Sequence, residues 1–376
     1  MMTTPPITPC LLLDSARMDA NIGRMAARMN TLGVDLRPHV KTCKNIDIGR
    51  RLIDGQPGGI TVSTLAEADY FFDHGLTDIL YAVGIAPGKL PAVAERMAGG
   101  MNLRIILDHV QTAQAVARAA KQLDIAFRAL IEIDADGERA GLQADDPDLL
   151  EIGDILDTAR CRLDGVMVHA GGSYHSKDEA GMRAMAETER VSAVNAAERL
   201  RQAGFEAPIV SVGSTPTATF ATDLTGVTEV RAGVHVFQDL VQAGLGVCTI
   251  DDIAISVLTE VIGHRIRQGQ VLVDAGWMAL SRDRGTADQA VDQGYGLLCD
   301  ESGRVLVDII VAGTNQEHGI LGRRDGSALD PRDFPVGSRW RILPNHACAT
   351  AAQHDGYWTI ENGRITDRWL PRCRGW

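Results

Sequence analysis

The apolar and polar positions of this chain follow two different periods over its first two thirds. Short apolar runs of strand length alternate with segments in which apolar residues recur every three or four positions, as they do on one face of a helix. Strands that alternate with helices are typical of right-handed β-α-β units built around a parallel sheet. The pattern predicts strands at residues 36–40, 60–63, 79–83, 103–107, 127–133, 163–169, 209–212 and 229–234.

About eight such units close a (β/α)8 TIM barrel, and roughly 200 residues is at the lower end for one. An open, doubly wound sheet is the alternative arrangement of the same units. No GxGxxG sequence follows the first predicted strand, which disfavours a dinucleotide-binding fold. We therefore predict an α/β fold whose first part is a barrel.

The character of the sequence changes near residue 246. Further predicted strands, joined by Gly- and Asp-rich turns, lie at residues 253–263, 271–275, 305–311, 340–343, 357–361 and 365–370. A run of strands after a run of β-α units indicates a second, mainly β domain. The predicted domains are 15–246 for the barrel and 247–376 for the β domain, with a strand at 8–14 returning to pair in the latter. The polar segment 282–295 is a candidate active-site or interface loop.

Composition narrows the classes of function. The chain has 376 residues, a net charge of −12 and a pI of about 5.3, so it offers no basic stripe for nucleic acid. We find no apolar run long enough to span a bilayer and no secretory signal pattern. The 7 cysteines are scattered and form no CxxC pair. Free thiols of this kind fit a reducing cytoplasm, so we expect a cytoplasmic protein that acts on a small molecule.

Lys41 stands where the first predicted strand ends and a βα loop begins. The carboxyl ends of barrel strands are where chemistry is placed, and a lysine there can form a Schiff base with a carbonyl cofactor. A lysine taken alone is most often a solvated surface residue. Small and hydroxyl residues follow the last two barrel strands, around Ser214 and Gly233, where such barrels commonly bind phosphate. Lys41 and these loops together favour pyridoxal 5'-phosphate.

His346 and Cys348 form a second constellation, directly after the predicted strand 340–343. On extended backbone, an H-x-C pair places both side chains on one face, at a spacing that one metal ion can bridge. Thiolate and imidazole suit Zn²⁺, and two protein ligands would leave positions open for substrate or water. Nearby, Glu317 and His318 of a polar cluster could orient these ligands, or could simply belong to a polar turn.

Several segments together resemble the D-serine dehydratase-like group of fold-type III pyridoxal phosphate enzymes: RPHVKT, HAGGSY, VSVGSTPT, EVRAGV, VDAGWMALSRDRGTA, NQEHG and PNHACAT. The resemblance covers nearly the whole chain, in the family's order. It implies an alanine-racemase-like barrel, a β domain and a homodimer. A related group of aldolases carries H-x-D where this chain has His346 and Cys348, so the resemblance favours a dehydratase. His235 stands where near relatives are expected to have Tyr.

The resemblance also implies a role for each site residue. Lys41 would hold the cofactor as a Schiff base, and the remaining cofactor contacts would be Arg139 at the phenolic oxygen, His169 beside the ring, Tyr174 near the pyridine nitrogen, and Ser214, Thr215, Gly233 and Val234 at the phosphate. His346 and Cys348 would bind a divalent metal, with Zn²⁺ favoured and Mn²⁺ or Mg²⁺ as alternatives.

The expected reaction is α,β-elimination of water from a D-3-hydroxy amino acid. Lys41 would take the α-proton and the metal would assist departure of the β-hydroxyl. D-threo-3-hydroxyaspartate would give oxaloacetate and ammonia, and D-serine would give pyruvate. Retro-aldol cleavage to glycine and an aldehyde is the main alternative; a non-catalytic cofactor carrier and a racemase are others. A second substrate carboxylate would need a cation, from Arg282, Arg284 or Arg323.

Overall fold

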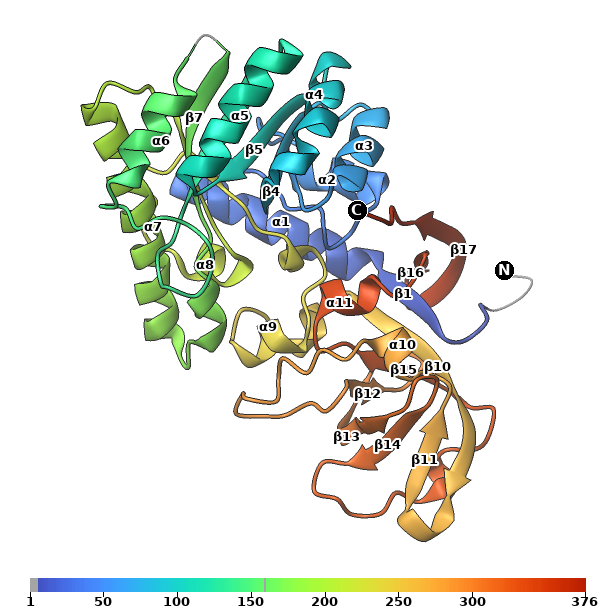
Figure 1. Ribbon diagram of the computed structural model, residues 1–376. Helices are drawn as coiled ribbons and strands as arrows, with labels where there is room; N and C mark the ends of the chain where they lie inside the picture. The colour runs from blue at the N-terminus through green and yellow to red at the C-terminus, as the bar shows by residue number, and fades with distance from the viewer. Residues whose placement is uncertain (1–5, 159) are drawn as a thin grey trace. The chain divides into compact units, whose positions relative to one another are not determined.

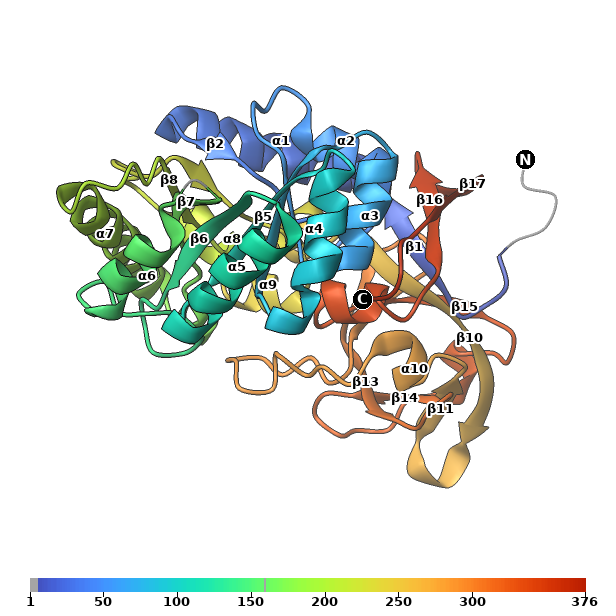
Figure 2. The same cartoon turned by 45° about the horizontal axis from the view of Figure 1, so that its top comes forward.

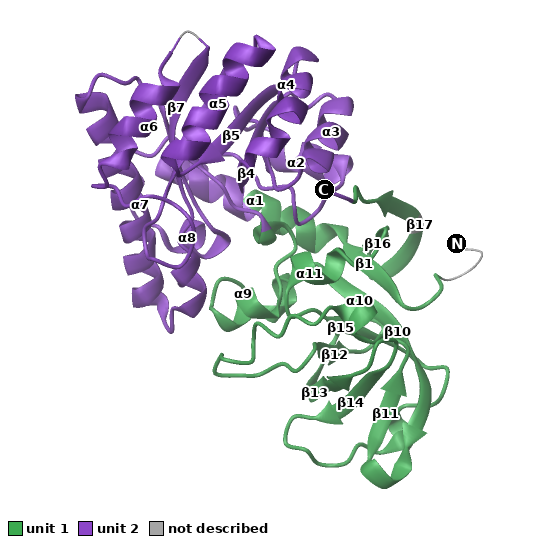
Figure 3. Cartoon of the chain, in the orientation of Figure 1, with its two compact units in different colours: residues 1–23, 234–374 green, residues 24–233, 375–376 purple. Residues whose placement is uncertain are grey.

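The computed structural model of the protein describes residues 6–158 and 160–376. Within these, the chain forms two compact units (Figure 3). One unit holds Arg24–Gly233 with the last two residues, and the other holds the described residues up to Gly23 together with Val234–Arg374. The functional domain limits 15–246 and 247–376 stay a prediction.

A curved parallel sheet is the centre of the first unit (Figures 1 and 2). In the described residues it has eight strands, in the order β2-β9-β8-β7-β6-β5-β4-β3. Their bounds are β2 Asp35–Leu36, β3 Ile60–Val62, β4 Asp78–Gly84, β5 Asn102–Leu107, β6 Phe127–Ile133, β7 Cys161–Val168, β8 Ile209–Val212 and β9 Glu229–Val230. The two edges meet beyond β2, where His39 bridges Thr61 and the Val40 N–H donates to the Thr61 carbonyl at 2.9 Å. The sheet therefore closes, which confirms the barrel and excludes the open doubly wound sheet.

Helices follow the strands and cover the outside of this sheet (Figure 1). Consecutive helices from α4 to α7 pack side by side, as β-α units do when they wind in one direction. Each helix turns its apolar stripe inward; on α6, Leu149, Ile152 and Leu156 are buried. The bounds are α1 Ser15–Leu32, α2 Ile46–Ile53, α3 Leu65–Asp73, α4 Leu90–Ala98, α5 Val110–Leu123, α6 Asp148–Leu156, α7 Glu179–Gln202 and α8 Thr215–Phe220, with one-turn helices η1 Pro87–Lys89 and η2 Gly171–His175.

The first and last barrel strands are shorter than the sequence predicted. Residues 36–40 contribute to β2 only at Leu36, because Pro38 has no N–H to donate to a ladder. Beyond Pro38, His39 forms one isolated parallel β-bridge with Thr61. The predicted strand 229–234 ends at Val230, and the segment beyond it forms part of the candidate site.

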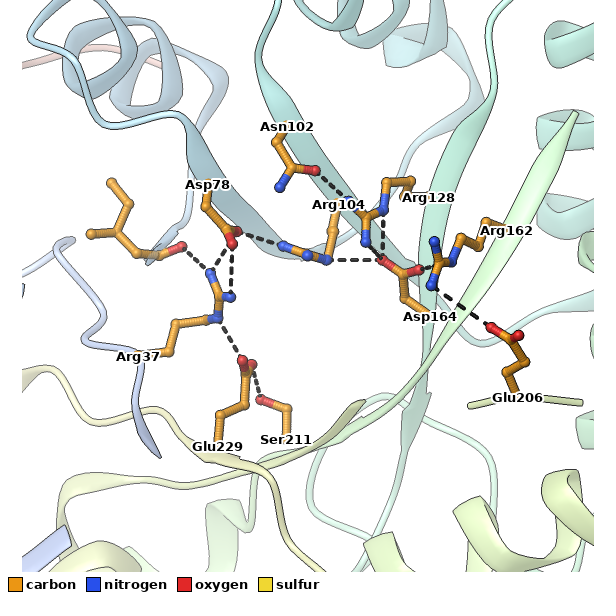
Figure 4. Close-up of polar contacts among 11 residues, drawn as sticks. Arg37, Asp78, Asn102, Arg104, Arg128, Arg162, Asp164, Glu206, Ser211 and Glu229 are labelled. Atoms are coloured by element: carbon orange, nitrogen blue, oxygen red, sulfur yellow. Dashed lines mark hydrogen bonds and ion pairs between the residues drawn. The ribbon is translucent and has the colours of Figure 1, made fainter. Parts of the chain in front are cut away.

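Alternating charges ring the barrel near the beginnings of its strands (Figure 4). Arg37 bonds Glu229 at 2.7 Å and Asp78 at 3.0 Å, and Arg104 bonds Asp78 at 2.5 Å and Asp164 at 2.9 Å. The Asp164 side chain is fully buried and also meets Arg128 and Arg162. Each buried carboxylate thus has cationic partners, which offsets its desolvation. Because functional residues of barrels lie at the opposite strand ends, this network supports the fold rather than the chemistry.

The second unit is built on an antiparallel barrel. In the described residues its sheet has nine strands, in the order β11-β14-β13-β12-β15-β10-β1-β16-β17, and β11 also pairs with β10. That additional pairing closes a ring of the strands from β10 to β15, and β1 joins the sheet between β10 and β16. The bounds are β1 Cys10–Asp14, β10 Ile255–Arg265, β11 Gln270–Val273, β12 Leu297–Cys299, β13 Val305–Thr314, β14 Gly319–Arg323, β15 Arg339–Leu343, β16 Gly356–Glu361 and β17 Arg364–Pro371.

Sequence patterns missed two of these strands. β12 is only three residues long, and β14 begins at one glycine and contains another, so both resembled turns. The helices of this unit are short: α9 Leu240–Gly244, α10 Trp277–Leu280, α11 Ala347–Ala351, η3 Val234–Val236, η4 Ile250–Asp252, η5 Ile266–Gln268 and η6 Pro331–Asp333. In the part of the chain that the structure describes, no helix combines the length and apolar character needed to cross a membrane.

Candidate active site

Lys41 lies just beyond the closure of the barrel. The bridge at His39 and the bond from Val40 to Thr61 fix the backbone on its N-terminal side. The Lys41 N–H points to His39 Nδ1 at 3.4 Å, and the side chain is half-buried. Among the described residues, its ammonium group has no hydrogen-bond or ion-pair partner. A half-buried, unpaired amine at a barrel strand end is available for a Schiff base.

Two neutral histidines stand near this amine. His169 ends the β7 segment and donates from Nδ1 to the Gly213 carbonyl at 3.0 Å. Burial, with Arg139 and Lys41 close by, lowers the pKa of His169 to about 3. Burial and the charges of Lys41 and Arg231 hold the pKa of His39 well below its usual value. Both rings are therefore uncharged at neutral pH, and the local charge is cationic, which suits an anionic ligand.

The loop after β8 offers buried hydroxyl and N–H groups. Ser214 is the N-cap of α8: its Oγ accepts from the Thr217 N–H at 3.2 Å, and its own N–H donates to Thr217 Oγ1 at 2.9 Å. Ser214 Oγ also lies 3.2 Å from Ser173 Oγ, in the loop that carries Tyr174. Gly213 has a φ of +128°, and a Cβ there would lie 2.6 Å from the Arg231 carbonyl oxygen. Any other residue at position 213 would collide with the Arg231 carbonyl and would be strained at this φ, so the turn into α8 requires glycine.

The loop after β9 comes close to the Lys41 segment. A Cβ on Gly233 would lie 3.0 Å from the His39 carbonyl oxygen and 3.4 Å from Thr42 Oγ1. Val234 follows as a buried residue at the start of η3, in the second unit. The loop after β9 can approach the Lys41 segment this closely because residue 233 has no side chain.

The remaining predicted cofactor residues lie on the loops after β6 and β7. Arg139 is exposed, and its Cγ and Cδ atoms pack 3.0 Å from the position of a Cβ on Gly171. Tyr174 is half-buried in η2. Lys41 and Arg139 are both close enough to His169 to lower its pKa. The loops that carry these three residues all follow the carboxyl ends of barrel strands.

Sequence reasoning did not select three residues of this region, of which His39 is half-buried and Arg231 and Glu189 are buried. His39 supports Lys41, and its Nε2 lies 3.3 Å from Ser63 Oγ. Arg231 donates to Ser211 Oγ and to the Val168 carbonyl, both at 2.5 Å. Glu189 comes from α7 and is 2% exposed. For Arg231 and Glu189, the sequence did contain a signal: each is a charged residue at a position where the strand or helix period predicts a buried apolar side chain.

The predicted metal pair lies at the start of α11 in the second unit. His346 is the N-cap, with φ −130° and ψ 110°, and Cys348 is in the first helical turn. The predicted extended backbone at Cys348 is therefore wrong, because a helix begins between the two residues. Their side chains nevertheless share a hydrogen bond. One extended residue followed by a helical turn still places positions i and i+2 in contact.

Asp283 orients the imidazole of His346. Its Oδ2 lies 2.6 Å from His346 Nδ1, which leaves Nε2 as the nitrogen for Cys348 or a metal. Burial opposes the charged imidazole, but the Cys348 thiolate and the bond to Asp283 outweigh it and raise the pKa of His346 to about 11. The hydrogen bond from His346 lowers the pKa of Asp283.

Glu317 and His318 do not have the orienting role that the sequence suggested. Both are exposed in the turn between β13 and β14, where Asn315 N–H donates to the His318 carbonyl at 2.8 Å. Glu317 accepts a surface bond from Gln316 at 3.2 Å, and the described residues provide it with no contact to His346. The carboxylate beside His346 comes instead from the segment 282–295, whose polar, irregular sequence was the signal for a functional loop.

The turn that carries the pair is held on two sides. Asp239, fully buried at the N-cap of α9, accepts from the Ala347 N–H at 2.8 Å. Asn345 accepts from Thr286 Oγ1 at 2.5 Å and donates to the Gly294 carbonyl at 2.6 Å. The positions of His346 and Cys348 are therefore fixed by groups distant in sequence.

These donors fit a divalent metal with open coordination positions. A thiolate and an imidazole with a carboxylate-bound Nδ1 are typical ligands of such an ion. Among residues 6–158 and 160–376, no group of three or more His, Cys, Asp or Glu side chains is arranged to hold a metal. The pair would therefore supply two protein ligands.

Comparison with known proteins identifies the family. The profile named Alanine racemase, N-terminal domain matches residues 13–240, and the profile named Putative serine dehydratase domain matches residues 254–360. D-threo-3-hydroxyaspartate dehydratase of Delftia sp. (strain HT23) is 51% identical over 373 residues, which is 98% of both chains. This chain belongs to the D-serine dehydratase-like family. A D-serine dehydratase of Dictyostelium discoideum is 29% identical over 94% of this chain and 93% of its own.

Solved structures of D-serine dehydratase-like enzymes agree with the fold. The Delftia dehydratase superposes with a TM-score of 0.96 at 51% identity, over 99% of this chain and 98% of that one. A cysteine-to-alanine variant of D-threo-3-hydroxyaspartate dehydratase, described as a metal-free form, has the same TM-score at 50% identity, over 99% and 98%. An alanine racemase of Clostridium difficile 630, 15% identical with a TM-score of 0.67 over 97% and 98%, shares the fold alone. The family likeness makes this chain a pyridoxal-phosphate-dependent dehydratase, a carbon–oxygen lyase.

Proposed function

We propose that the protein eliminates water from D-threo-3-hydroxyaspartate to give oxaloacetate and ammonia, with D-serine as a second substrate that gives pyruvate. The observation that carries the proposal is the pairing of His346 with Cys348 and Asp283, in a chain 51% identical to a D-threo-3-hydroxyaspartate dehydratase. A metal-binding pair suits a reaction in which hydroxide, a poor leaving group, has to depart.

Pyridoxal phosphate, bound at Lys41, would withdraw electrons from the substrate α-carbon and acidify its proton. The substrate amine would first displace Lys41 from the cofactor, and the freed Lys41 Nζ would then remove that proton, because no carboxylate among the described residues holds its amine elsewhere. The C–O bond breaks with its electron pair on the oxygen, and the released enamine hydrolyses to the keto acid and ammonia. In support of this assignment, neutral His169 lies near Arg139 in a cationic environment. The further proposed contacts are Tyr174 with the pyridine nitrogen, and Ser214, Thr215, Gly233 and Val234 with the phosphate.

A divalent cation held by His346 and Cys348 would act as a Lewis acid on the departing oxygen. Thiolate favours Zn²⁺, and Mn²⁺ or Mg²⁺ are alternatives. Asp283 binds Nδ1 of the imidazole, so that Nε2, on the side of Cys348, would be the coordinating nitrogen.

We assign the distal carboxylate of the substrate to Arg282. Its guanidinium lies over the Trp277 ring, 4.6 Å from the centroid, and has no carboxylate partner among the described residues. Arg284 is bound to Asp292 at 2.5 Å. Arg282 also adjoins Asp283, the partner of His346. Stacking on an aromatic face leaves the N–H edge of a guanidinium open for a carboxylate.

The proposed active form is a homodimer in which segment 282–295 lies at the interface. Support comes from the family likeness and from the exposed residues of this segment, such as Val291. Sedimentation of the active enzyme tests this assembly.

A keto-acid and ammonia assay over a panel of D- and L-3-hydroxy amino acids, with and without chelator, tests the function. We expect oxaloacetate and ammonia from the D-threo isomer of 3-hydroxyaspartate, and loss of both products when metal is removed. Glycine and an aldehyde as products would establish retro-aldol cleavage instead. Equal rates on L-isomers would contradict the proposed stereochemistry.

A further inference from the structure

Helix α7 carries a carboxylate on its buried face. The other buried positions of this face are apolar, among them Met182, Ala186 and Ala193, and they pack toward the barrel. Glu189 occupies the same stripe and is 2% exposed. Burying an ionised carboxylate is costly unless hydrogen bonds and charge compensate it. Its partners therefore indicate why an acid stands at an apolar position.

Those partners lie on two different barrel loops. Glu189 Oε1 accepts from the Ala170 N–H at 2.9 Å, directly after His169. Glu189 lines one small cavity together with Gly213 and Thr217. Burial raises the pKa of Glu189, and the Ala170 N–H, the Thr217 hydroxyl, the charge of Arg231 and the Gly213 N–H all act against that rise. One side chain thus ties the loop after β7 to the loop after β8.

Both loops carry groups assigned to the cofactor. The Gly213 carbonyl accepts from His169 Nδ1 at 3.0 Å, and the Gly213 N–H lowers the pKa of Glu189, so both peptide groups of Gly213 interact with this network. Thr217 Oγ1 accepts from the Ser214 N–H at 2.9 Å and donates to the Ser214 carbonyl at 3.4 Å, which fixes the turn into α8, and the same hydroxyl lowers the pKa of Glu189. Without the carboxylate, the Ala170 N–H beside His169 would lose its acceptor, and Gly213 and Thr217 would face an apolar cavity wall.

We propose that Glu189 is a positioning residue that holds the Gly213–Thr217 turn and the His169 loop in the shape that binds the cofactor phosphate. The carboxylate does not touch the cofactor; it acts through Gly213 and Thr217. This inference rests on the proposed function, because it assumes pyridoxal phosphate at Lys41. It goes beyond that function because it assigns a role to Glu189, a residue of α7 that does not contact the cofactor.

The test compares release of cofactor from holoenzymes. Glu189→Gln keeps the size of the side chain but replaces one acceptor oxygen with a donor amide that faces buried donors. Full-length wild type, Glu189→Gln and the control Glu198→Gln, an exposed glutamate of the same helix, are loaded with pyridoxal phosphate or with phosphate-free pyridoxal. Release is followed by loss of the visible absorption in the presence of a carbonyl trap. Phosphorus-31 spectra of the bound phosphate are recorded in parallel.

We expect Glu189→Gln to release pyridoxal phosphate on the order of tenfold to a hundredfold faster, with a shifted phosphorus resonance. Release of pyridoxal should stay close to wild type, and Glu198→Gln should behave as wild type throughout. Unchanged release of pyridoxal phosphate, or equal acceleration for pyridoxal, would overturn the positioning role. A merely structural defect would accelerate both ligands alike.

Thr217→Val gives a second test if Glu189→Gln does not fold. It removes the hydroxyl that interacts with Glu189 and also the acceptor of the Ser214 N–H, and it should accelerate release selectively for the phosphorylated ligand. If Thr217→Val accelerated the release of pyridoxal phosphate and of pyridoxal by the same factor, the proposal would be overturned. A wild type that shows no visible absorption after loading would refute the cofactor assignment itself, whereas an absorbing wild type with unaffected variants refutes only the role of Glu189.

Discussion

Asp283 Oδ2 lies 2.6 Å from His346 Nδ1 and fixes the imidazole beside Cys348. Removing such a carboxylate partner typically costs tenfold to a hundredfold in metal affinity. We expect Asp283→Asn to lose roughly that factor in affinity while the pyridoxal absorption is kept. Titration with a competing chelator measures it. Asp288→Asn, an exposed aspartate of the same segment, is the matched control, and equal affinity in both variants would contradict an orienting role.

Loss of the metal should affect departure of hydroxide far more than departure of a better leaving group. We expect Cys348→Ala, or chelated wild type, to lose on the order of a thousandfold in dehydration with a nearly unchanged melting temperature. Elimination from β-chloro-D-alanine should suffer much less, because chloride departs without a Lewis acid. Cys373→Ala serves as the control thiol. Equal losses for both substrates would refute a leaving-group role, and full activity without metal would refute the site.

Arg282 should distinguish the substrate with two carboxylates from the one with a single carboxylate. We expect Arg282→Ala to raise KM for D-threo-3-hydroxyaspartate by about tenfold or more, because a charge-assisted bond is lost. KM for D-serine should change little. Steady-state kinetics with both substrates checks this, with Arg323→Ala as the control. A selective effect in Arg323→Ala and none in Arg282→Ala would move the assignment to β14.

Lys41 should be the single point of covalent attachment of the cofactor. We expect visible absorption in the purified or reconstituted protein, and borohydride reduction followed by peptide mapping should place the label on Lys41. Lys44→Ala is a suitable control, because Lys44 forms an ion pair with Glu67 at 2.9 Å in the same segment. A label at any other lysine would be incompatible with the proposed mechanism.

Asp78 should contribute to stability in a pH-dependent way. Burial alone would raise its pKa, but Arg37 and Arg104 outweigh it and hold the pKa below 3.8. A depressed folded-state pKa gives a contribution that is present above about pH 3.8 and is lost as pH falls through the lower folded value. The free energy of unfolding of wild type and Asp78→Asn, measured from neutral to acid pH, should therefore converge in acid. A difference that is constant with pH would contradict this linkage; Asp73→Asn is the exposed control.

The sequence was sufficient for features that depend on neighbours along the chain. Helical and strand periods are local, so the barrel strands and the positions of Lys41 and Ser214 at strand ends followed from the pattern. Local rules failed where backbone geometry deviates from a regular period. β14 contains glycines in a strand, and His346 and Cys348 lie on either side of a helix start.

Contacts between distant segments were decided only by the tertiary structure. Asp283 is 63 positions from His346, so no sequence period connects them, and Glu317 and His318 were equally plausible partners by composition. Closure of the barrel at His39 and Thr61 likewise depends on strand twist and tilt, which pattern alone does not specify. The sequence by itself determined which candidate residues, such as Lys41 and Ser214, follow the carboxyl ends of predicted strands. The fold decided which of them meet, because hydrogen bonds and burial act through space rather than along the chain.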